Sequence, residues 1–582
     1  MTGLGAKHHG RTAFYGRLML FALRMSAGTR DTTGTTLRGV RRSLRHRNLC
    51  ARVVWGVSAA FLFSPATAQP AEVATPRPVT ADWPAVVRDV VALSPKLAQR
   101  REEMPRRRSR IAKRLGSAVH KEGMAPLARL NALVADRFPG LAGVPVPVLV
   151  PFETRSFLNS ASHGRGRQRK GRGEAEFLFG AGGTLDIVRG KTGYDALVTF
   201  TPSALEKLGL TSKQNRLLHI GGSALTYGGT AVGESVAELE DLFPGLRRTR
   251  HEDEVTYSLV KYGVPYFASV SCSDRPFHPN RLNCAEAERL LRSAVRNLSL
   301  VGGGPLPVRA PRASAAPAAR PTRVSDTFTY HSPGKLMAGT DVGGHEGVGD
   351  HTVYGDILFP IRVAPSFAQP QVFMHWGNCL SDPGTTDSEI PLPRQPGDTH
   401  DRYRCKQNTK ELLHWEGHPE NYSYPWRDNF CEARDRPTPE CPGALGHQGQ
   451  DVRASSCPPD PGDADRCQAD VYEVVAVADG NAFRDGNKIR LIVDPGRLYY
   501  VYLHMNSNTL DAAGMRDQQN NPVHKGQVIG KVGNFDGVRG GTSTHVHFEI
   551  HPGSAAARFN PYMTLIRAYE RLIGEQGTEL AD

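Results

Sequence analysis

Two histidines separated by a single residue, His545 and His547, lie in a run of alternating polar and apolar side chains. This alternation, from Thr542 to Ile550, is typical of a β-strand. Side chains two residues apart in a strand point to the same face, so the two imidazoles should lie side by side while Val546 and Phe548 point into a core. Neutral imidazole is a standard zinc ligand, and the pair therefore predicts a metal site.

Further polar groups in the C-terminal part of the chain could complete that site. His447 and Asp451 stand four residues apart in a glycine-containing loop, where both side chains can turn onto one cation. His504 ends a strand expected from Tyr499, and we expect it on the exposed side. His447, Asp451 and one of the paired histidines make a His2Asp set, and three protein ligands plus a water are typical of catalytic zinc sites. The other two histidines could then act as a general base and as electrostatic support for a tetrahedral intermediate.

In this order, three motifs resemble those of LytM/lysostaphin-type zinc metallopeptidases: His447-x-x-x-Asp451, Tyr502-Leu503-His504 and His545-x-His547. The similarity covers about 440–565 and extends more loosely back to about 326. The resemblance implies that His447, Asp451 and His547 hold one Zn²⁺ per chain. It implies that His504 and His545 are catalytic histidines beside a metal-bound water. It also implies a β-sheet groove for a peptide, with the peptide part of bacterial peptidoglycan as the usual substrate.

Two segments depart from the compact pattern of that family. The stretch 452–470 is a Pro/Asp-rich insertion, and the stretch 422–441 is rich in aromatic residues, including Trp426 and Phe430. We expect these segments to wall the groove, which leaves open the cross-link that is cut.

Other histidines need a separate interpretation. His345, Asp350 and His351 lie in a Gly-rich loop that could mimic a metal site, and we expect them not to bind zinc. His524 lies beside a turn and should be a surface residue. His551 follows the strand of the paired histidines, and we expect it near the rim of the groove.

The first 68 residues carry most of the positive charge and are typical of a secretory signal. They hold ten Arg and one Lys against one Asp, which supplies +10 of the formal charge of +14. An apolar run from Val53 to Phe63 follows six arginines, and Ala66-Thr67-Ala68 offers small residues for cleavage before Gln69. We therefore expect an exported protein that is periplasmic, in the cell envelope or secreted. The alternative is an uncleaved N-terminal anchor.

Cysteine usage agrees with export. Eight cysteines follow Cys50, and an even count in an exported chain predicts disulfides. We expect bonds between cysteines that are close in sequence, which leaves one more distant pair. The expected pairs are Cys272–Cys284, Cys431–Cys441, Cys457–Cys467 and Cys379–Cys405.

Composition divides the rest of the chain into two domains. After an expected linker at 69–81, residues 82–300 mix helical patterns with short strands and predict an α+β N-terminal domain of unknown role. A Gly/Pro/Ala/Arg-rich linker at 301–325 is the clearest boundary. Residues 326–582 predict a mainly antiparallel β domain of the LytM type, so the expected fold is multidomain. Elements expected in the first domain are strands at 184–188, 196–200, 216–220 and 265–270 and a helix at 284–298.

Together these features predict an exported zinc metalloendopeptidase that hydrolyses peptide cross-links of peptidoglycan through a metal-activated water. Its main partners would be peptidoglycan peptide stems. The Arg-rich stretch 100–114 suggests an added contact with an anionic wall or membrane surface. The charge beyond residue 68 is only about +4, so no nucleic-acid partner is expected. The alternatives are a non-catalytic LytM-like regulator that binds the wall, and a structural protein that acts through its basic N-terminal region.

Overall fold

The structure, a computed structural model, describes most of the chain beyond residue 75. Contacts divide the chain into two compact units, Met1–Thr67 and Ala68–Asp582. The expected signal at 1–68 lies outside the described residues. The described ranges are 76–99, 124–162, 183–212, 214–227, 233–251, 253–274, 281–306, 319–336, 347–368, 391–392, 402–403, 425–434, 438–454, 459–460, 463–553 and 557–580.

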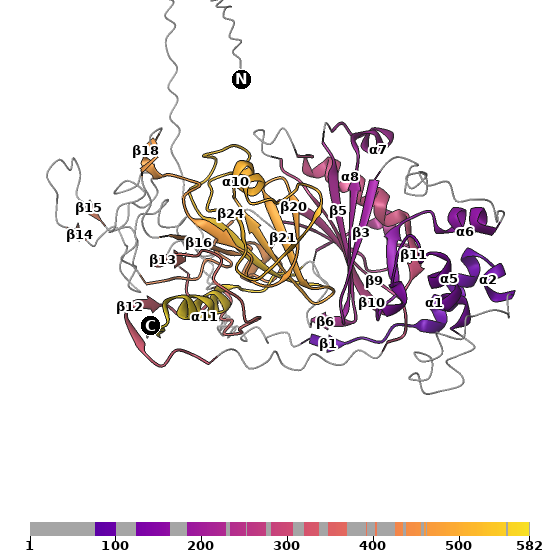
Figure 1. The fold of residues 1–582 in the computed structure, drawn as a ribbon, viewed down its shortest axis with the longest axis horizontal. Coiled ribbons are helices and arrows are strands. Elements are labelled where there is room, and N and C mark those ends of the chain that lie inside the picture. The colour runs from indigo at the N-terminus through magenta and orange to yellow at the C-terminus, as the bar shows by residue number, and fades with distance from the viewer. Residues whose placement is uncertain are drawn as a thin grey trace, which may run out of the picture. The chain divides into compact units, whose positions relative to one another are not determined.

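The second unit is largely β-sheet and contains two antiparallel sheets of seven strands each (Figure 1). In the first sheet the order is β3-β4-β5-β10-β9-β8-β7. Every residue of β4 and β5 is buried, as expected for strands that are covered on both faces. The strands of the first sheet are β3 (Gly183–Arg189), β4 (Gly193–Phe200), β5 (Arg216–Ser223), β7 (Glu234–Ser235), β8 (Arg247–Arg250), β9 (Glu254–Lys261) and β10 (Val264–Ser271).

Helices and a small strand pair pack with the first sheet. Helix α8 (Cys284–Arg296) begins at a capping box, in which Asn283 and Glu286 satisfy each other's backbone amides. Its apolar stripe, which includes Leu290 and Leu291, joins the core formed with β4, β5, β9 and β10. The other elements on this side are α1 (Trp83–Leu93), α2 (Lys96–Gln99), α5 (Ala125–Leu133), α6 (Thr154–Ser162), α7 (Pro202–Lys207), β2 (Val148–Pro151) and β11 (Leu298–Gly302).

The second sheet holds the histidine motifs and has the order β13-β16-β25-β22-β21-β20-β23. Val546 and Phe548 of β25 point into a separate core, as the alternation predicts. Helix α11 (Tyr562–Ile573) and helix α10 (Ser507–Ala512) pack residues into that core. The strands are β13 (Ser366–Ala368), β16 (Gln450–Ala454), β20 (Gly480–Asp485), β21 (Lys488–Asp494), β22 (Leu498–Leu503), β23 (Asn520–Val523) and β25 (Val546–Pro552).

Short strand pairs complete the described architecture. They are β1 (Pro76–Pro78) with β6 (Leu225–Tyr227), β12 (Val324–Tyr330) with β26 (Gln576–Glu579), β14 (Pro391–Leu392) with β15 (Arg402–Tyr403), β17 (Pro459–Asp460) with β18 (Asp463–Cys467), and β19 (Glu473–Val475) with β24 (Val528–Lys531).

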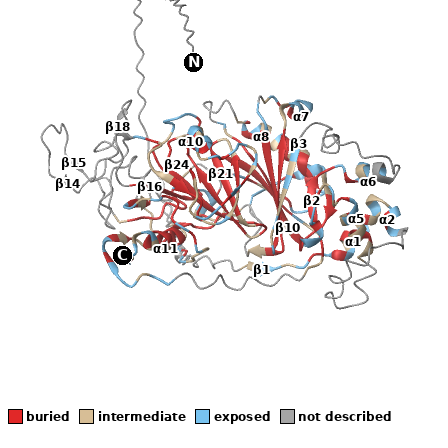
Figure 2. Cartoon of the chain, in the orientation of Figure 1, coloured by how far each residue is buried: buried red, intermediate tan, exposed pale blue. Residues whose placement is uncertain are grey.

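The two seven-stranded sheets contact each other through a third apolar cluster. Leu197, Leu217 and Phe267 come from the first sheet. They pack with residues of β20, β21 and β22, and Figure 2 shows the strands of both sheets as mostly buried. The second sheet therefore has its own core on one face and the first sheet against part of the other. The residues contributed by the second sheet are Phe483, Ile492, Tyr499, Val501 and Leu503.

The strand and helix predictions for 175–300 agree with β3, β4, β5, β10 and α8, but β7, β8 and β9 were not predicted. Two of the expected disulfides, Cys272–Cys284 and Cys431–Cys441, are present. The other two pairs include cysteines outside the described residues.

The aromatic segment before Cys441 does not form the expected wall where the structure describes it. Trp426 is buried and packs its ring on Phe328 and Tyr569 in the core of the second sheet. Phe430 is also buried, beside the Cys431–Cys441 disulfide. The expectation was therefore wrong for these two side chains, because burial of large aromatic surface outweighs exposure in a groove.

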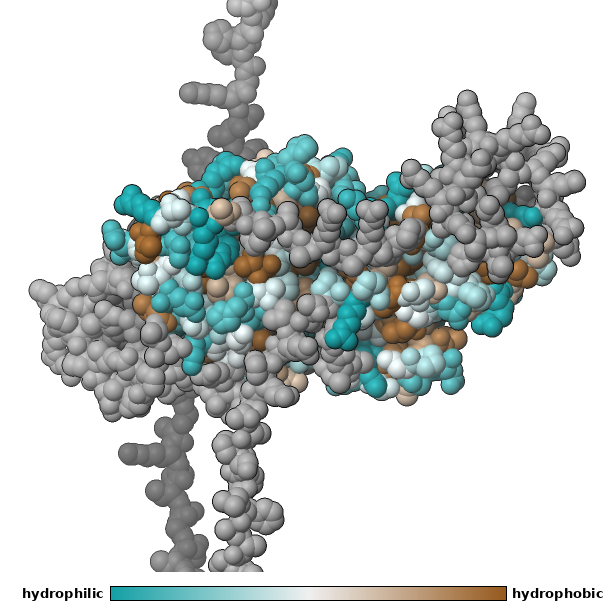
Figure 3. Space-filling view, turned by 90° about the horizontal axis from the view of Figure 1, so that it is seen from below, coloured by the Kyte–Doolittle hydropathy of each residue, from teal (hydrophilic) through white to brown (hydrophobic). Residues whose placement is uncertain are grey.

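The described surface mixes polar and apolar residues. On the face shown in Figure 3, hydrophobic and hydrophilic residues are interspersed. Within the described ranges, no helix has the length and apolar character needed to span a membrane.

Candidate metal centre

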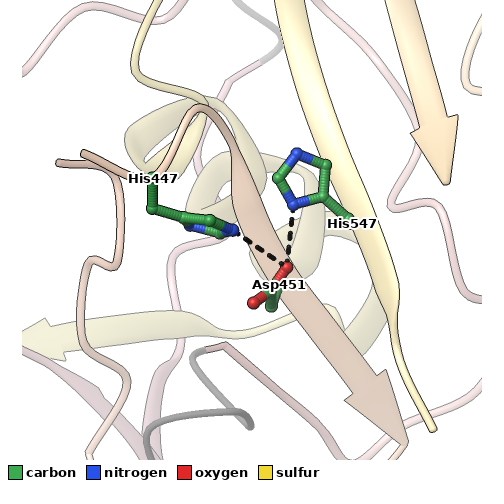
Figure 4. Close-up of side chains that lie close together, drawn as sticks. All are labelled: His447, Asp451 and His547. Carbon is green, nitrogen blue, oxygen red and sulfur yellow. Dashed lines mark hydrogen bonds and ion pairs between the residues drawn. The ribbon is translucent and has the colours of Figure 1, made fainter. Parts of the chain in front are cut away.

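Two histidines and an aspartate come together where β16 lies beside β25. Asp451 is the second residue of β16, rather than part of a loop, and it pairs directly with His547 across the ladder. His447 lies in the loop that leads into β16. One potential ligand atom from each residue lies within 4.8 Å of the other two (Figure 4). Two imidazole nitrogens and one carboxylate oxygen match the donor set that zinc takes in catalytic sites.

One oxygen of Asp451 is the centre of this cluster. Its Oδ1 lies 3.0 Å from His547 Nδ1. The same oxygen lies 3.5 Å from His447 Nε2 and 3.5 Å from His545 Nε2. Its Oδ2 accepts a hydrogen bond from Asn429 Nδ2 at 3.1 Å. The carboxylate is therefore turned so that Oδ1 faces the imidazoles.

In each candidate ligand histidine, the outer ring nitrogen, which points away from Asp451, is already hydrogen-bonded. His447 Nδ1 donates to the carbonyl oxygen of Asn429 at 2.9 Å. His547 Nε2 donates to Glu549 Oε1 at 3.0 Å. A proton on the outer nitrogen leaves the lone pair of the inner nitrogen for a metal, and such outer partners orient metal ligands generally. The inner nitrogens are then His447 Nε2 and His547 Nδ1.

His545 faces the same point from the residue just before β25, which begins at Val546 rather than at the expected Thr542. Its Nδ1 donates to the carbonyl oxygen of Ser543 at 2.8 Å. Its Nε2 is buried and has no hydrogen-bond partner. A buried nitrogen without a partner costs free energy, so a group that occupies the space beside it would be favoured. This observation fits an ion or its bound water at the cluster.

His504 completes the group of histidines from the end of β22. Its ring centroid lies 4.6 Å from that of His545 and 6.0 Å from that of His547. Its backbone has φ of 71°, an uncommon value for a residue other than glycine. Its Nδ1 donates to the carbonyl oxygen of Phe535 at 2.9 Å. His504 is only 7% exposed, so the expectation of an exposed side was wrong: its turned backbone points the ring into the cluster.

The charge of Asp451 suits metal binding. Burial alone would raise the pKa of Asp451, but the neighbouring His447, His545 and His547 hold that pKa well below its usual range. An ionised carboxylate is the ligand form that a metal requires. Burial lowers the pKa of His545, which favours the neutral imidazole.

His551 does not lie at a rim. It is buried, and its Nε2 contacts Glu549 Oε2 inside the protein, so the earlier expectation was wrong. The physical reason is that Glu549 needs partners for both oxygens once it is buried. His524 has a side chain that is 93% exposed, as predicted. Asp350 accepts a hydrogen bond from Tyr354, whereas His345 lies outside the described residues.

Sequence reasoning missed two residues that support the site. Glu549 shares the face of His545 and His547 and could have been found from the alternation of the strand. Asn429 lies far from the motifs in sequence, and only the folded chain brings its amide to Asp451.

Comparison with known proteins adds no relative: no family model, curated protein or solved structure matches this chain.

Proposed function

We propose that this protein is an exported zinc-dependent endopeptidase that hydrolyses peptide cross-links of bacterial peptidoglycan. The observation that carries the proposal is the convergence of His447 Nε2, His545 Nε2 and His547 Nδ1 on one carboxylate oxygen of Asp451. The substrate class and the exported location rest on the motif resemblance to LytM-type peptidases and on the signal-like N-terminus.

His447, Asp451 and His547 would hold the metal. A bound Zn²⁺ would supply a Lewis acid that acidifies water and polarises a peptide carbonyl. His545, which is neutral and has a free Nε2, can accept a proton at that nitrogen. When its Nε2 is also protonated, His504 could stabilise the negative charge that develops on the scissile peptide.

The full chain tests this proposal directly. We expect the purified protein to bind zinc and to release muropeptides from sacculi, and mass spectrometry of the products would identify the bond that is cut. A chelator should stop the release, and added zinc should restore it. Activity that survives both chelation and His447→Ala would contradict the proposal.

Burial of the cluster supports a second candidate, a non-catalytic regulator of wall hydrolases. Asp451 and His545 are completely buried, so a peptide would have to reach the metal through a narrow opening or after a movement. A full chain that binds zinc and sacculi but releases no muropeptide would favour the regulator. Turnover that depends on His545 would exclude it.

A further inference from the structure

Glu549 connects the candidate metal centre to a chain of buried charges. Its Oε1 accepts from the ligand candidate His547 at 3.0 Å. Its Oε2 accepts from Arg558 Nε at 3.2 Å, and Arg558 is only 2% exposed. His551 Nε2 contacts the same oxygen, so the position of this carboxylate depends on Arg558 and His551 as well as on His547.

Arg558 in turn bonds a carboxylate of the first sheet. Its Nη2 donates to Oε1 of Glu254, the first residue of β9, at 2.8 Å. The other oxygen of Glu254 receives Lys488 Nζ at 2.9 Å and Arg490 Nη2 at 2.6 Å, both from β21. One buried carboxylate of the first sheet thus holds two cations of β21 and Arg558, which lies between β25 and α11.

A second contact joins the turn before β9 to the residue that follows His447, the other histidine among the candidate ligands. His251 lies between β8 and β9, and its Nδ1 accepts from Gln448 Nε2 at 3.0 Å. Gln448 directly follows His447 in the chain. The backbone amide of His251 donates to the carbonyl oxygen of Glu254 at 2.8 Å, so the two contacts belong to one turn. The β8–β9 turn and the start of β9 therefore contact a neighbour of His447 and, through Arg558, a partner of His547.

We propose that Glu254 is a positioning residue for the metal ligand His547, acting through Arg558 and Glu549, and that the first sheet is thereby part of the support of the metal centre. We call the series of contacts Glu254–Arg558–Glu549–His547 the carboxylate relay. Without the Glu254 charge, Arg558 loses its ion pair with the first sheet and moves toward Glu549. The contacts of Glu549 with Arg558, His551 and His547 then change geometry, and His547 Nδ1 loses its fixed direction.

The relay rests on the proposed zinc site, and the test separates the two. The zinc affinity of the full chain is measured by competition with a chromogenic chelator, and the Co²⁺-substituted chain is measured by absorption spectroscopy. We expect Glu254→Gln to weaken zinc binding about tenfold and to shift the Co²⁺ bands, since outer-shell partners usually change metal affinity by this order. A wild-type chain that binds no zinc would refute the proposed function itself.

Asp195→Asn is the matched control. Asp195 is also a buried carboxylate of the first sheet that reaches the second, because its Oδ2 accepts from the Gly496 amide at 3.0 Å. Its other oxygen bonds His219 at 2.7 Å and does not join the relay. Both variants should lower the melting temperature, but only Glu254→Gln should lower zinc affinity. Unchanged affinity in Glu254→Gln, or an equal loss in both variants, would overturn the relay.

A double variant tests whether the residues act in series. If Glu254 acts through Glu549, the combination Glu254→Gln with Glu549→Gln should bind zinc no more weakly than Glu549→Gln alone. Additive losses would show that Glu254 acts by another route. Should Glu254→Gln fail to fold, Arg558→Lys replaces it: the lysine keeps the charge but cannot bond both carboxylates, so affinity should again fall. Wild-type affinity in Arg558→Lys would refute the relay.

Discussion

Asn429 bonds Asp451 through both ends of its side-chain amide. Its Oδ1 accepts from the Asp451 backbone amide at 3.2 Å, and its Nδ2 donates to Asp451 Oδ2 at 3.1 Å. The same residue accepts the Nδ1 proton of His447 on its carbonyl oxygen. One asparagine thus orients two of the three candidate ligands.

Replacing Asn429 by alanine should therefore weaken metal binding. The substitution leaves the buried Asp451 Oδ2 without its donor, which costs about 1–3 kcal/mol, and frees the carboxylate to rotate. We expect zinc affinity to fall by about 10- to 100-fold, as for other outer-shell partners. Asn429→Asp is a useful comparison, because a second carboxylate beside Asp451 should be worse than alanine. Titration with a competing chelator measures both, and wild-type affinity in Asn429→Ala would contradict this role.

Substitutions of His545 and of His547 should have different effects. His547→Ala removes a candidate ligand and should lose bound zinc. His545→Ala should keep zinc and lose about 10²- to 10⁴-fold in turnover, the usual contribution of a general acid–base group. Metal content by mass spectrometry and muropeptide release are measured on the same preparations. Loss of zinc from His545→Ala with retention in His547→Ala would reverse the assignment.

The Cys431–Cys441 disulfide should matter for the metal as well as for stability. The amide of Cys431 donates to the His447 carbonyl oxygen at 2.9 Å. The disulfide therefore fixes a residue that is bonded directly to the backbone of His447. Replacing both cysteines by serine should cost about 2–4 kcal/mol of unfolding free energy and also weaken zinc binding.

The Cys272–Cys284 pair provides the comparison for that variant. It joins the end of β10 to α8 and encloses a similar number of residues, and the Cys272 amide donates to Asp253 beside Glu254 rather than to a candidate ligand. Its removal should lower the melting temperature and change zinc affinity less than removal of Cys431–Cys441. Equal affinity in the two double variants would show that Cys431–Cys441 has no specific effect on the site.

Buried histidines should make the metal-free protein less stable as the pH falls. Burial lowers the pKa of His219, although Asp195 opposes the shift. Below about pH 6.5 the unfolded chain binds a proton that the folded chain does not, so stability decreases with falling pH. His219→Gln keeps a donor for Asp195 and removes this titration. In chelator, the wild type should lose up to about 1.4 kcal/mol more per pH unit than His219→Gln.

Two buried carboxyl groups have the opposite effect and stabilise the folded protein as the pH falls. Burial raises the pKa of Asp428 to about 7 and the pKa of Glu440 to about 7. Their folded forms take up protons as the pH falls through 7, which adds stability to the folded state. Because both proteins carry these groups, the difference between wild type and His219→Gln in urea unfolding at several pH values isolates the histidine. Parallel pH profiles would refute the assignment.

The sequence by itself determined the local features of the site. A strand's side-chain period is two, so alternation alone placed His545 and His547 on one face and Val546 and Phe548 in a core. Short spacing also predicted the Cys272–Cys284 and Cys431–Cys441 bonds, because closing a short loop between two cysteines costs less conformational entropy than closing a long one.

Only the tertiary structure decided which distant groups meet. The pairing of Asp451 with His547 depends on the register of β16 against β25, which packing of the whole sheet sets. Strand β8, with three arginines among its four residues, gives no apolar alternation, so its place in the sheet was not predicted. Glu254 is charged and yet buried, because Lys488 and Arg490 of β21 and Arg558 after β25 compensate its charge. Such compensation depends on partners far away in the sequence, and the support of the candidate metal centre therefore becomes visible only in the folded chain.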